Sequence, residues 1–126
     1  MTLDGLGQHL LADLYGCSHL ADSDVVERAL RAGAEAGGAT LLHLHVHRFG
    51  EGQGVTGVAL LAESHISIHT WPEHGFAAVD LFLCGRRHSV PAALEALARH
   101  FHPVEVRQQI CVRGVGMRTR ELTAPD

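Results

Sequence analysis

With 126 residues the chain has room for one compact domain, and its 46% hydrophobic and 19% charged content is typical of a soluble globular protein. The net charge of −4 argues against a protein that binds nucleic acid, and no apolar run is long enough to cross a membrane. All ten basic residues are Arg, which excludes enzymes that hold pyridoxal phosphate on a lysine and P-loop enzymes that need one.

The first predicted elements are a segment at residues 7–15, whose pattern fits a strand or a helix, and a helix after it. The sequence Asp-Ser-Asp at residues 22–24 is typical of a helix start, because capping oxygens and early acidic groups satisfy its free N–H groups. Apolar residues then recur at helical spacing up to Gly33, and two glycines at 37–38 predict the end of the helix.

Residues 39–49 alternate between apolar and polar side chains, which predicts a strand with one polar face. One face is expected to hold Leu42, Leu44 and Val46, and the other His43, His45 and His47. Three imidazoles on one face could converge on Zn²⁺, but three ligands from one strand lie in a line and suit tetrahedral geometry poorly. We therefore expect a polar interface or a solvated sheet face here, and no metal site.

The rest of the chain predicts more strands and a second helix. Strands are predicted at residues 55–62, 65–70, 76–84 and 104–112. Ser89 is a predicted N-cap, and the apolar stripe of the helix behind it ends at Phe101. This order of elements predicts an α+β two-layer sandwich, in which a mainly antiparallel sheet carries two helices on one face. We expect residues 1–126 to form this single domain.

The cysteines indicate a reducing compartment. Cys17, Cys84 and Cys111 are odd in number and lack CxxC spacing, which favours thiols over a disulfide framework. No basic segment followed by an apolar one is visible at the N-terminus, so no secretory signal is predicted. We expect a cytoplasmic protein.

The densest group of polar residues lies at 63–73 (ESHISIHTWPE), and Asp80 and Cys84 follow it. A serine among histidines suggests nucleophilic catalysis, although no Gly-x-Ser-x-Gly elbow surrounds Ser64. Each candidate also has an ordinary interpretation: a strand-end serine that hydrogen-bonds locally, a structural His69, and a cysteine that acts as a small buried hydrophobe. Spacing alone leaves both interpretations open.

The stretch from residue 54 to 85, GVTGVALLAESHISIHTWPEHGFAAVDLFLCG, closely resembles the prokaryotic S-adenosylmethionine decarboxylase family. Shorter matches are GQHLLADLYGC near the N-terminus, GAT at residues 38–40 and HRF at residues 47–49. The motifs lie in about the first 85 residues, and the general layout of helix and strand agrees afterwards. ESHxxIHTWPE is long and chemically unusual, so the match is specific.

The resemblance implies an enzyme that makes its own cofactor. Members of the family are synthesised as proenzymes and cleave themselves before a serine, which becomes a pyruvoyl group at the new N-terminus. Carried over, the cut lies between Glu63 and Ser64 and leaves a β chain of residues 1–63 and an α chain of residues 64–126. Ser64 Oγ attacks the carbonyl of Glu63 to form an ester, and β-elimination then releases the upstream chain.

Two further residues match processing roles in the family. His69 matches the base that removes the α-proton of Ser64, and Thr56 falls where the family commonly carries a processing serine. Strict alternation along a strand would put Ser64 and His69 on opposite faces. We therefore expect a bend or a β-bulge between these two residues.

In the mature enzyme, the resemblance implies a pyruvoyl ketone that reacts with the substrate amine and accepts the electrons freed when CO₂ leaves. Cys84 matches the proton donor to the substrate α-carbon. Glu73 matches an acidic residue that holds ribose hydroxyls. Phe49 and Trp71 lie where aromatic contacts to adenine or to the sulfonium are expected.

The leading hypothesis is therefore a pyruvoyl-dependent S-adenosylmethionine decarboxylase that supplies aminopropyl groups for spermidine synthesis. The family implies a homodimer of αβ protomers with sites near the interface. One alternative keeps the fold and the self-processing but decarboxylates arginine or ornithine. Another is a catalytically dead or metal-binding homologue, and the presence of Ser64, His69 and Cys84 together argues against the dead version.

Overall fold

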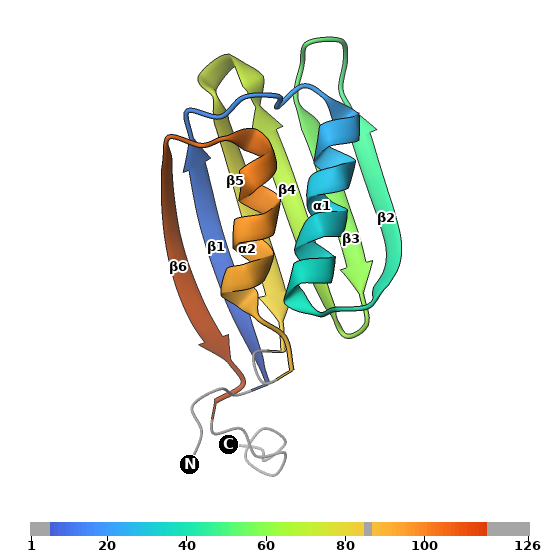
Figure 1. Ribbon diagram of the computed structural model, residues 1–126, viewed down its shortest axis with the longest axis vertical. Coiled ribbons are helices and arrows are strands. Elements are labelled where there is room, and N and C mark those ends of the chain that lie inside the picture. Colours follow the sequence, from blue (N-terminus) through green and yellow to red (C-terminus); the bar gives the residue numbers. More distant parts are fainter. Residues whose placement is uncertain (1–5, 85–86, 116–126) are drawn as a thin grey trace, which may run out of the picture.

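The computed structural model describes residues 6–84 and 87–115, in which strands and helices form two layers (Figure 1). The strands are β1 (Gly7–Tyr15), β2 (Leu41–Arg48), β3 (Val55–Leu61), β4 (Ser64–Trp71), β5 (Phe76–Leu83) and β6 (Glu105–Arg113). The helices are α1 (Ser23–Gly37) and α2 (Val90–Ala98), with short 3₁₀ turns η1 (Pro72–His74) and η2 (Arg99–Phe101). The predicted α+β sandwich is confirmed. The predicted domain of residues 1–126 includes residues 1–5, 85–86 and 116–126, which lie outside the described part.

The sheet is antiparallel between all its neighbouring strands, in the order β2-β3-β4-β5-β1-β6. The segment at residues 7–15, which fitted a strand or a helix, is strand β1. It lies between β5 and β6, both of which follow it much later in the chain. Its alternate residues Leu10, Ala12 and Leu14 are almost completely buried, because they face the helices.

Both helices lie side by side over one face of the sheet (Figure 1). The Asp22 side chain caps α1 as predicted, accepting hydrogen bonds of 3.0 and 3.3 Å from N–H groups of the first turn. Gly38, in the left-handed conformation at φ 81°, ends this helix. Ser89 caps α2 by accepting a bond from the N–H of Ala92. The sequence therefore set both helix starts by local hydrogen bonding.

The core between helices and sheet depends on one close approach. Gly57 lies on β3 beneath α1, where a Cβ atom would lie 2.8 Å from Leu30 Cδ1 and 3.2 Å from Val26 Cγ1. Both of these helix residues are fully buried. A larger side chain at Gly57 would push α1 off the sheet, so the glycine sets how closely the two layers pack.

The opposite face of the sheet, which we call the open face, carries no helix in residues 6–84 and 87–115. Because side chains alternate along strands that pair in register, the open face is built of cross-strand rows. One row contains His43, Leu60, His65, Phe82, His9 and Cys111. The next two contain His45, Val58, Ser67, Asp80, Leu11 and Gln109, then His47, Thr56, His69, Ala78, Asp13 and Arg107. Polar and apolar groups thus mix on one exposed surface.

One prediction for β2 is wrong. The three histidines do share a face, but Leu42 does not lie with Leu44 and Val46, and 66% of its surface is exposed. The pairing with β3 shifts register between Leu41 and His43. An extra residue in one strand of a pair breaks the alternation at that point, which turns Leu42 away from the core.

Candidate active site

The Glu63–Ser64 peptide bond lies at a tight turn between two central strands. β3 and β4 pair without interruption from Thr56 with His69 to Leu61 with Ser64, so only Ala62 and Glu63 form the turn. Both turn residues are exposed, and Ser64 is half-buried. The Ser64 hydroxyl donates a hydrogen bond of 3.2 Å to the carbonyl of Ala62. The bond predicted to be cut is therefore accessible, and the hydroxyl of the predicted nucleophile, Ser64, lies beside it.

The backbone of this turn is strained at Glu63. Its φ of 67° lies in the left-handed region, which residues other than glycine adopt at a cost of about 1–3 kcal/mol. The carbonyl of the same residue is the one that the Ser64 hydroxyl would attack. The structure thus holds backbone strain at the residue before the predicted cut.

Cys84 lies at the same end of the sheet as this turn. β4 and β5 pair His65 with Phe82, and Glu63 and Cys84 each lie two residues further toward this end. The carbonyl of Cys84 accepts hydrogen bonds from the N–H groups of Arg87 and His88, at 3.1 and 2.9 Å. The predicted scissile bond and the predicted proton donor therefore lie at the same end of the sheet.

His69 forms a pair with Thr56 on the open face. Thr56 Oγ1 and His69 Nδ1 are 3.2 Å apart across the β3–β4 register. The two residues that match processing roles are thus in direct contact. Because Thr56 keeps a hydroxyl, it can orient the imidazole as a serine would.

The expected bulge between Ser64 and His69 is absent, and this expectation is wrong. β4 pairs regularly with β3 and with β5 between these positions. At about 3.3 Å per residue, five steps separate the two residues by about 16 Å along the strand. Their side chains also leave opposite faces. Within one chain, His69 cannot reach the α-proton of Ser64.

The predicted substrate-binding residues lie beyond His69, away from Ser64. Trp71, at the end of β4, is 40% exposed and lies against the rings of Phe76 and His69, with centroids 5.4 and 6.5 Å away. Glu73 is exposed in η1, and Phe49, 60% exposed, follows β2 with its ring 4.7 Å from that of His47. The site residues therefore form two groups, one at each end of β4.

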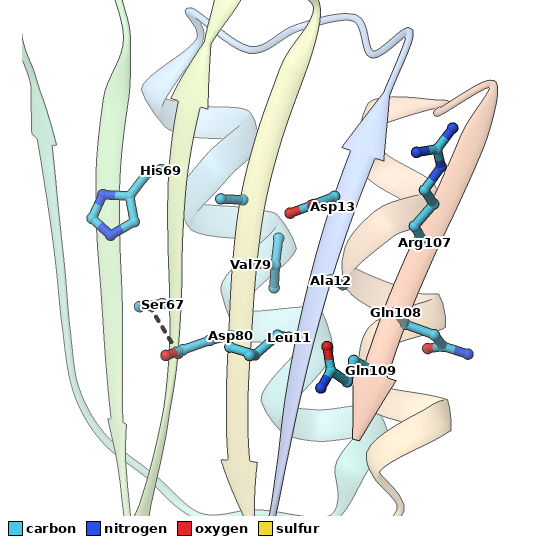
Figure 2. Close-up of a pocket in the computed structure, with 11 residues that line it drawn as sticks. Leu11, Ala12, Asp13, Ser67, His69, Val79, Asp80, Arg107, Gln108 and Gln109 are labelled. Carbon is cyan, nitrogen blue, oxygen red and sulfur yellow. Dashed lines mark hydrogen bonds between the residues drawn. The ribbon is translucent and has the colours of Figure 1, made fainter. Parts of the chain in front are cut away.

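A shallow pocket of about 470 Å³ opens on the open face between these groups (Figure 2). Ser67 and His69 from β4 and Asp80 from β5 line one side, and Asp13 from β1 and Arg107 from β6 line the other. Ser67 Oγ donates to Asp80 Oδ1 at 2.9 Å. Sequence reasoning missed Arg107 here, because its place depends on β6 joining β1, which no local pattern indicates.

One group of possible metal ligands occurs among the described residues, formed by His9, His65 and Asp80. His9 Nε2 is 3.2 Å from Asp80 Oδ2, and His65 Nε2 is 3.3 Å from Asp80 Oδ1. Arg113 approaches His9 Nδ1 at 3.3 Å and can only donate, so Nδ1 accepts and Nε2 carries the hydrogen. A metal would need a lone pair at Nε2 instead. Asp80 thus accepts a hydrogen bond from His9 and lies within ion-pair distance of His65.

Two further observations concern the Cys17 thiol and the two helices. Burial raises the pKa of the Cys17 thiol to about 11, which leaves this cysteine protonated and inert. Neither helix in the described part of the chain is long and apolar enough to cross a membrane.

Comparisons with known proteins agree with the sequence motifs. Residues 8–114 match the family model described as S-adenosylmethionine decarboxylase. The chain is 41% identical over 113 residues to an S-adenosylmethionine decarboxylase proenzyme from Thermomicrobium roseum, covering 90% of this chain and 97% of the relative. It is 52% identical over 94 residues to a proenzyme of the same name from Prochlorococcus marinus, covering 73% of this chain and 74% of the relative.

The fold also has a solved counterpart. The crystal structure of the adenosylmethionine decarboxylase from Aquifex aeolicus superposes with a TM-score of 0.72 at 38% identity, covering 88% of this chain and 92% of that one. Sequence motifs, the match across most of the chain and the shared fold agree. The chain belongs to the S-adenosylmethionine decarboxylase family.

Proposed function

We propose that this chain is a pyruvoyl-dependent S-adenosylmethionine decarboxylase, activated by autocatalytic cleavage between Glu63 and Ser64. Cleavage gives a β chain of residues 1–63 and an α chain of residues 64–126. The single observation that carries the proposal is the exposed, strained turn at the Glu63–Ser64 bond, with Cys84 beside it, in a member of this family. The products act in polyamine synthesis, as aminopropyl donors for spermidine.

Cleavage starts at the Ser64 hydroxyl. The Oγ atom bonds to the Glu63 carbonyl carbon, the C–N bond between the two residues breaks, and the nitrogen takes a proton, so that an ester replaces the amide. The Ser64 hydroxyl lies 3.2 Å from the carbonyl oxygen of Ala62, so it already points back toward the turn that contains the Glu63 carbonyl. This orientation supports its role as the nucleophile. Removal of the Ser64 α-proton by a base then expels the upstream chain as a carboxylate.

The base in this proposal is His69 of a second copy of the chain. Within one chain, Ser64 and His69 are about 16 Å apart along β4, so the two cannot meet. The contact with Thr56 orients the His69 imidazole on the open face, where a second chain can pack. Two copies can pack with their open faces together, related by a two-fold axis that runs between the sheets at right angles to the strands. In this arrangement the His69 end of β4 in one copy lies over the Ser64 end of β4 in the other. The exposed Leu11, Leu60 and Trp71 would be buried by such packing. We therefore propose a homodimer of αβ protomers with composite sites.

The cofactor in this proposal is the pyruvoyl group derived from Ser64, which supplies a ketone that withdraws electrons from the bound substrate as CO₂ leaves. The donor set fits the group: Ser64 stands at the turn, and no lysine competes for the role. Cys84 holds the proton that ends on the substrate α-carbon. Its place at the same end of the sheet as Glu63 supports this role.

In this proposal, substrate selectivity comes from the exposed residues at the end of β4 that is distant from Ser64. Trp71 and Phe49 offer aromatic faces for adenine or the sulfonium, and Glu73 offers a carboxylate for the ribose diol. Arginine and ornithine have neither adenine nor ribose. The relatives reported above are named for S-adenosylmethionine, so a decarboxylase of arginine or ornithine is not favoured.

The thiols support a cytoplasmic location. None of the three cysteines, all of which the structure describes, forms a disulfide. Such a state is usual where glutathione and thioredoxin keep thiols reduced.

Mass spectrometry of the purified protein tests the proposal. Two 63-residue products should form, and the one starting at position 64 should be lighter than a serine-started peptide by one ammonia. Ser64→Ala should remain intact. A wild-type chain that stays uncleaved after prolonged incubation would contradict the proposed function.

A further inference from the structure

The loop after β5 brings an arginine against two residues of the proposed site. Arg87 Nη2 donates to a carboxylate oxygen of Glu63 at 3.0 Å, and the backbone N–H of Arg87 donates to the carbonyl of Cys84 at 3.1 Å, which keeps the guanidinium near the Cys84 side chain. These contacts raise the pKa of Arg87 above its ordinary value, first through the Cys84 side chain and then through the Glu63 carboxylate. Arg87 thus joins the turn with the proposed scissile bond to the proposed proton donor.

Backbone hydrogen bonds hold the loop in this place. The carbonyl of Cys84 accepts hydrogen bonds from the N–H groups of both Arg87 and His88, which ties residues 87–88 to the end of β5. The N–H of Ser89 then donates to the carbonyl of Gly37 at the end of α1, at 3.1 Å, and the Ser89 hydroxyl caps α2. Residues 87–89 are therefore tied to the end of β5 on one side and to both helices on the other.

We propose that Arg87 is a positioning residue for Cys84, holding its thiol toward the Glu63–Ser64 end of the sheet and stabilising the sulfur after it gives up its proton. The inference rests on the proposed role of Cys84. In that step the S–H bond breaks, a C–H bond forms at the substrate α-carbon, and the electron pair of the S–H bond stays on sulfur. A guanidinium beside the sulfur favours the anion, and arginine keeps its charge throughout the physiological range.

The ion pair with Glu63 is not sufficient to explain why Arg87 lies at this position. The side chains of Arg87 and Glu63 are 65% and 77% exposed, and ion pairs in such surroundings add little to folding stability. The contact with Cys84 gives the guanidinium a chemical partner instead. Because the arginine is so exposed, its replacement should leave the fold intact.

Alkylation of Cys84 by iodoacetamide tests the contact without any turnover. The full-length chain carrying Ser64→Ala keeps every molecule uncleaved, and peptide mass spectrometry follows each cysteine separately. At neutral pH, adding Arg87→Ala should slow alkylation of Cys84 by about threefold or more, because the thiolate is the reacting form. Arg87→Lys keeps a charge without the planar fork and should slow it less.

The chain offers matched controls for this experiment. Arg99→Ala removes the same charge at the far end of α2, where its nearest carboxylate is 3.9 Å away, and should leave the rate at Cys84 unchanged. Cys17, inert through burial, reports that each variant remains folded, and exposed Cys111 reports the reagent. Equal rates in Arg87→Ala and Arg99→Ala would overturn the proposal.

A second readout separates this inference from the proposed function. In cleaved enzyme, Arg87→Ala should raise the share of transaminated product relative to decarboxylated product, because protonation at the α-carbon slows. If alkylation slows while the product ratio stays fixed, Arg87 contacts Cys84 but does not affect the proton transfer. That result would overturn the positioning role of Arg87 and leave the role of Cys84 to be tested by Cys84→Ala.

Discussion

A mixture of two inactive chains should recover self-cleavage if the site is composite. His69→Ala removes the proposed base but keeps Ser64, whereas Ser64→Ala removes the nucleophile but keeps His69. Expressed alone, neither variant should cleave. In a mixed dimer, the Ser64 of the first chain meets the His69 of the second, so one of the two sites is complete and the chain carrying His69→Ala is cut.

The size of the effect follows from the geometry. About 16 Å along β4 separates Ser64 from His69 within a chain, and a proton transfer needs the two groups within hydrogen-bond reach, about 3 Å. Intrachain rescue is therefore impossible. With equal expression and random pairing, about half of the His69→Ala chains lie in mixed dimers, so about half should be cleaved.

Mass spectrometry reads this outcome directly. The α half-chain that appears should carry Ala at position 69, together with the β half-chain of residues 1–63. Intact chains carrying Ala at position 64 and uncut His69→Ala chains should remain. Pairing His69→Ala with itself at the same total concentration is the control. Absence of cleavage in the mixture, with mixed dimers present by native mass spectrometry, would refute the composite site. Cleavage by the Ser64→Ala chain alone would refute the role of the serine.

Three further outcomes are expected. Cys84→Ala should still cleave at least in part, but turnover should yield transaminated product, measured by mass spectrometry; normal product would remove Cys84 as donor. Glu73→Gln should weaken S-adenosylmethionine binding by about 1.5–3 kcal/mol, the usual contribution of a hydrogen bond to a charged group, in a calorimetric titration. Labelled CO₂ release from S-adenosylmethionine should exceed that from arginine or ornithine, and the reverse would reassign the substrate. Gly57→Ala should lower the free energy of unfolding by about 1–3 kcal/mol in urea, because its Cβ meets Leu30, and an unchanged midpoint would contradict the close packing.

Local patterns predicted most elements of the fold. Capping by Asp22 and Ser89 depends on residues within one turn, so the sequence contains the whole signal. The prediction that Leu42 faces the core was wrong, because the register shift at this point depends on the partner strand. Alternation within one strand cannot reveal such a shift. The place of β1 between β5 and β6 is likewise a property of pairing over long distances in the chain.

The sequence predicted which residues belong to the candidate site but not how they are arranged in space. The motif gathered Ser64, His69 and Cys84 as one group, whereas the structure divides them between the two ends of β4. A continuous strand explains the division, because without a bulge Ser64 and His69 stay at opposite ends of β4 and on opposite faces. Arg87 carried no signal in the sequence, because its contacts with Glu63 and Cys84 arise from how the loop after β5 turns back. The catalytic roles themselves stay predictions.

The strand order has a consequence for the life of the mature protein. Residues 1–63 supply β1, β2 and β3, and residues 64–126 supply β4, β5 and β6, so β1 of the first piece stands between two strands of the second. Once the Glu63–Ser64 bond is cut, the pieces stay interleaved without a covalent link. Unfolding then releases two separate peptides, and regaining the fold becomes a bimolecular event whose yield falls with dilution. We expect the intact chain to refold after denaturation, whereas a chain cut between Glu63 and Ser64 should recover poorly when it is diluted from denaturant.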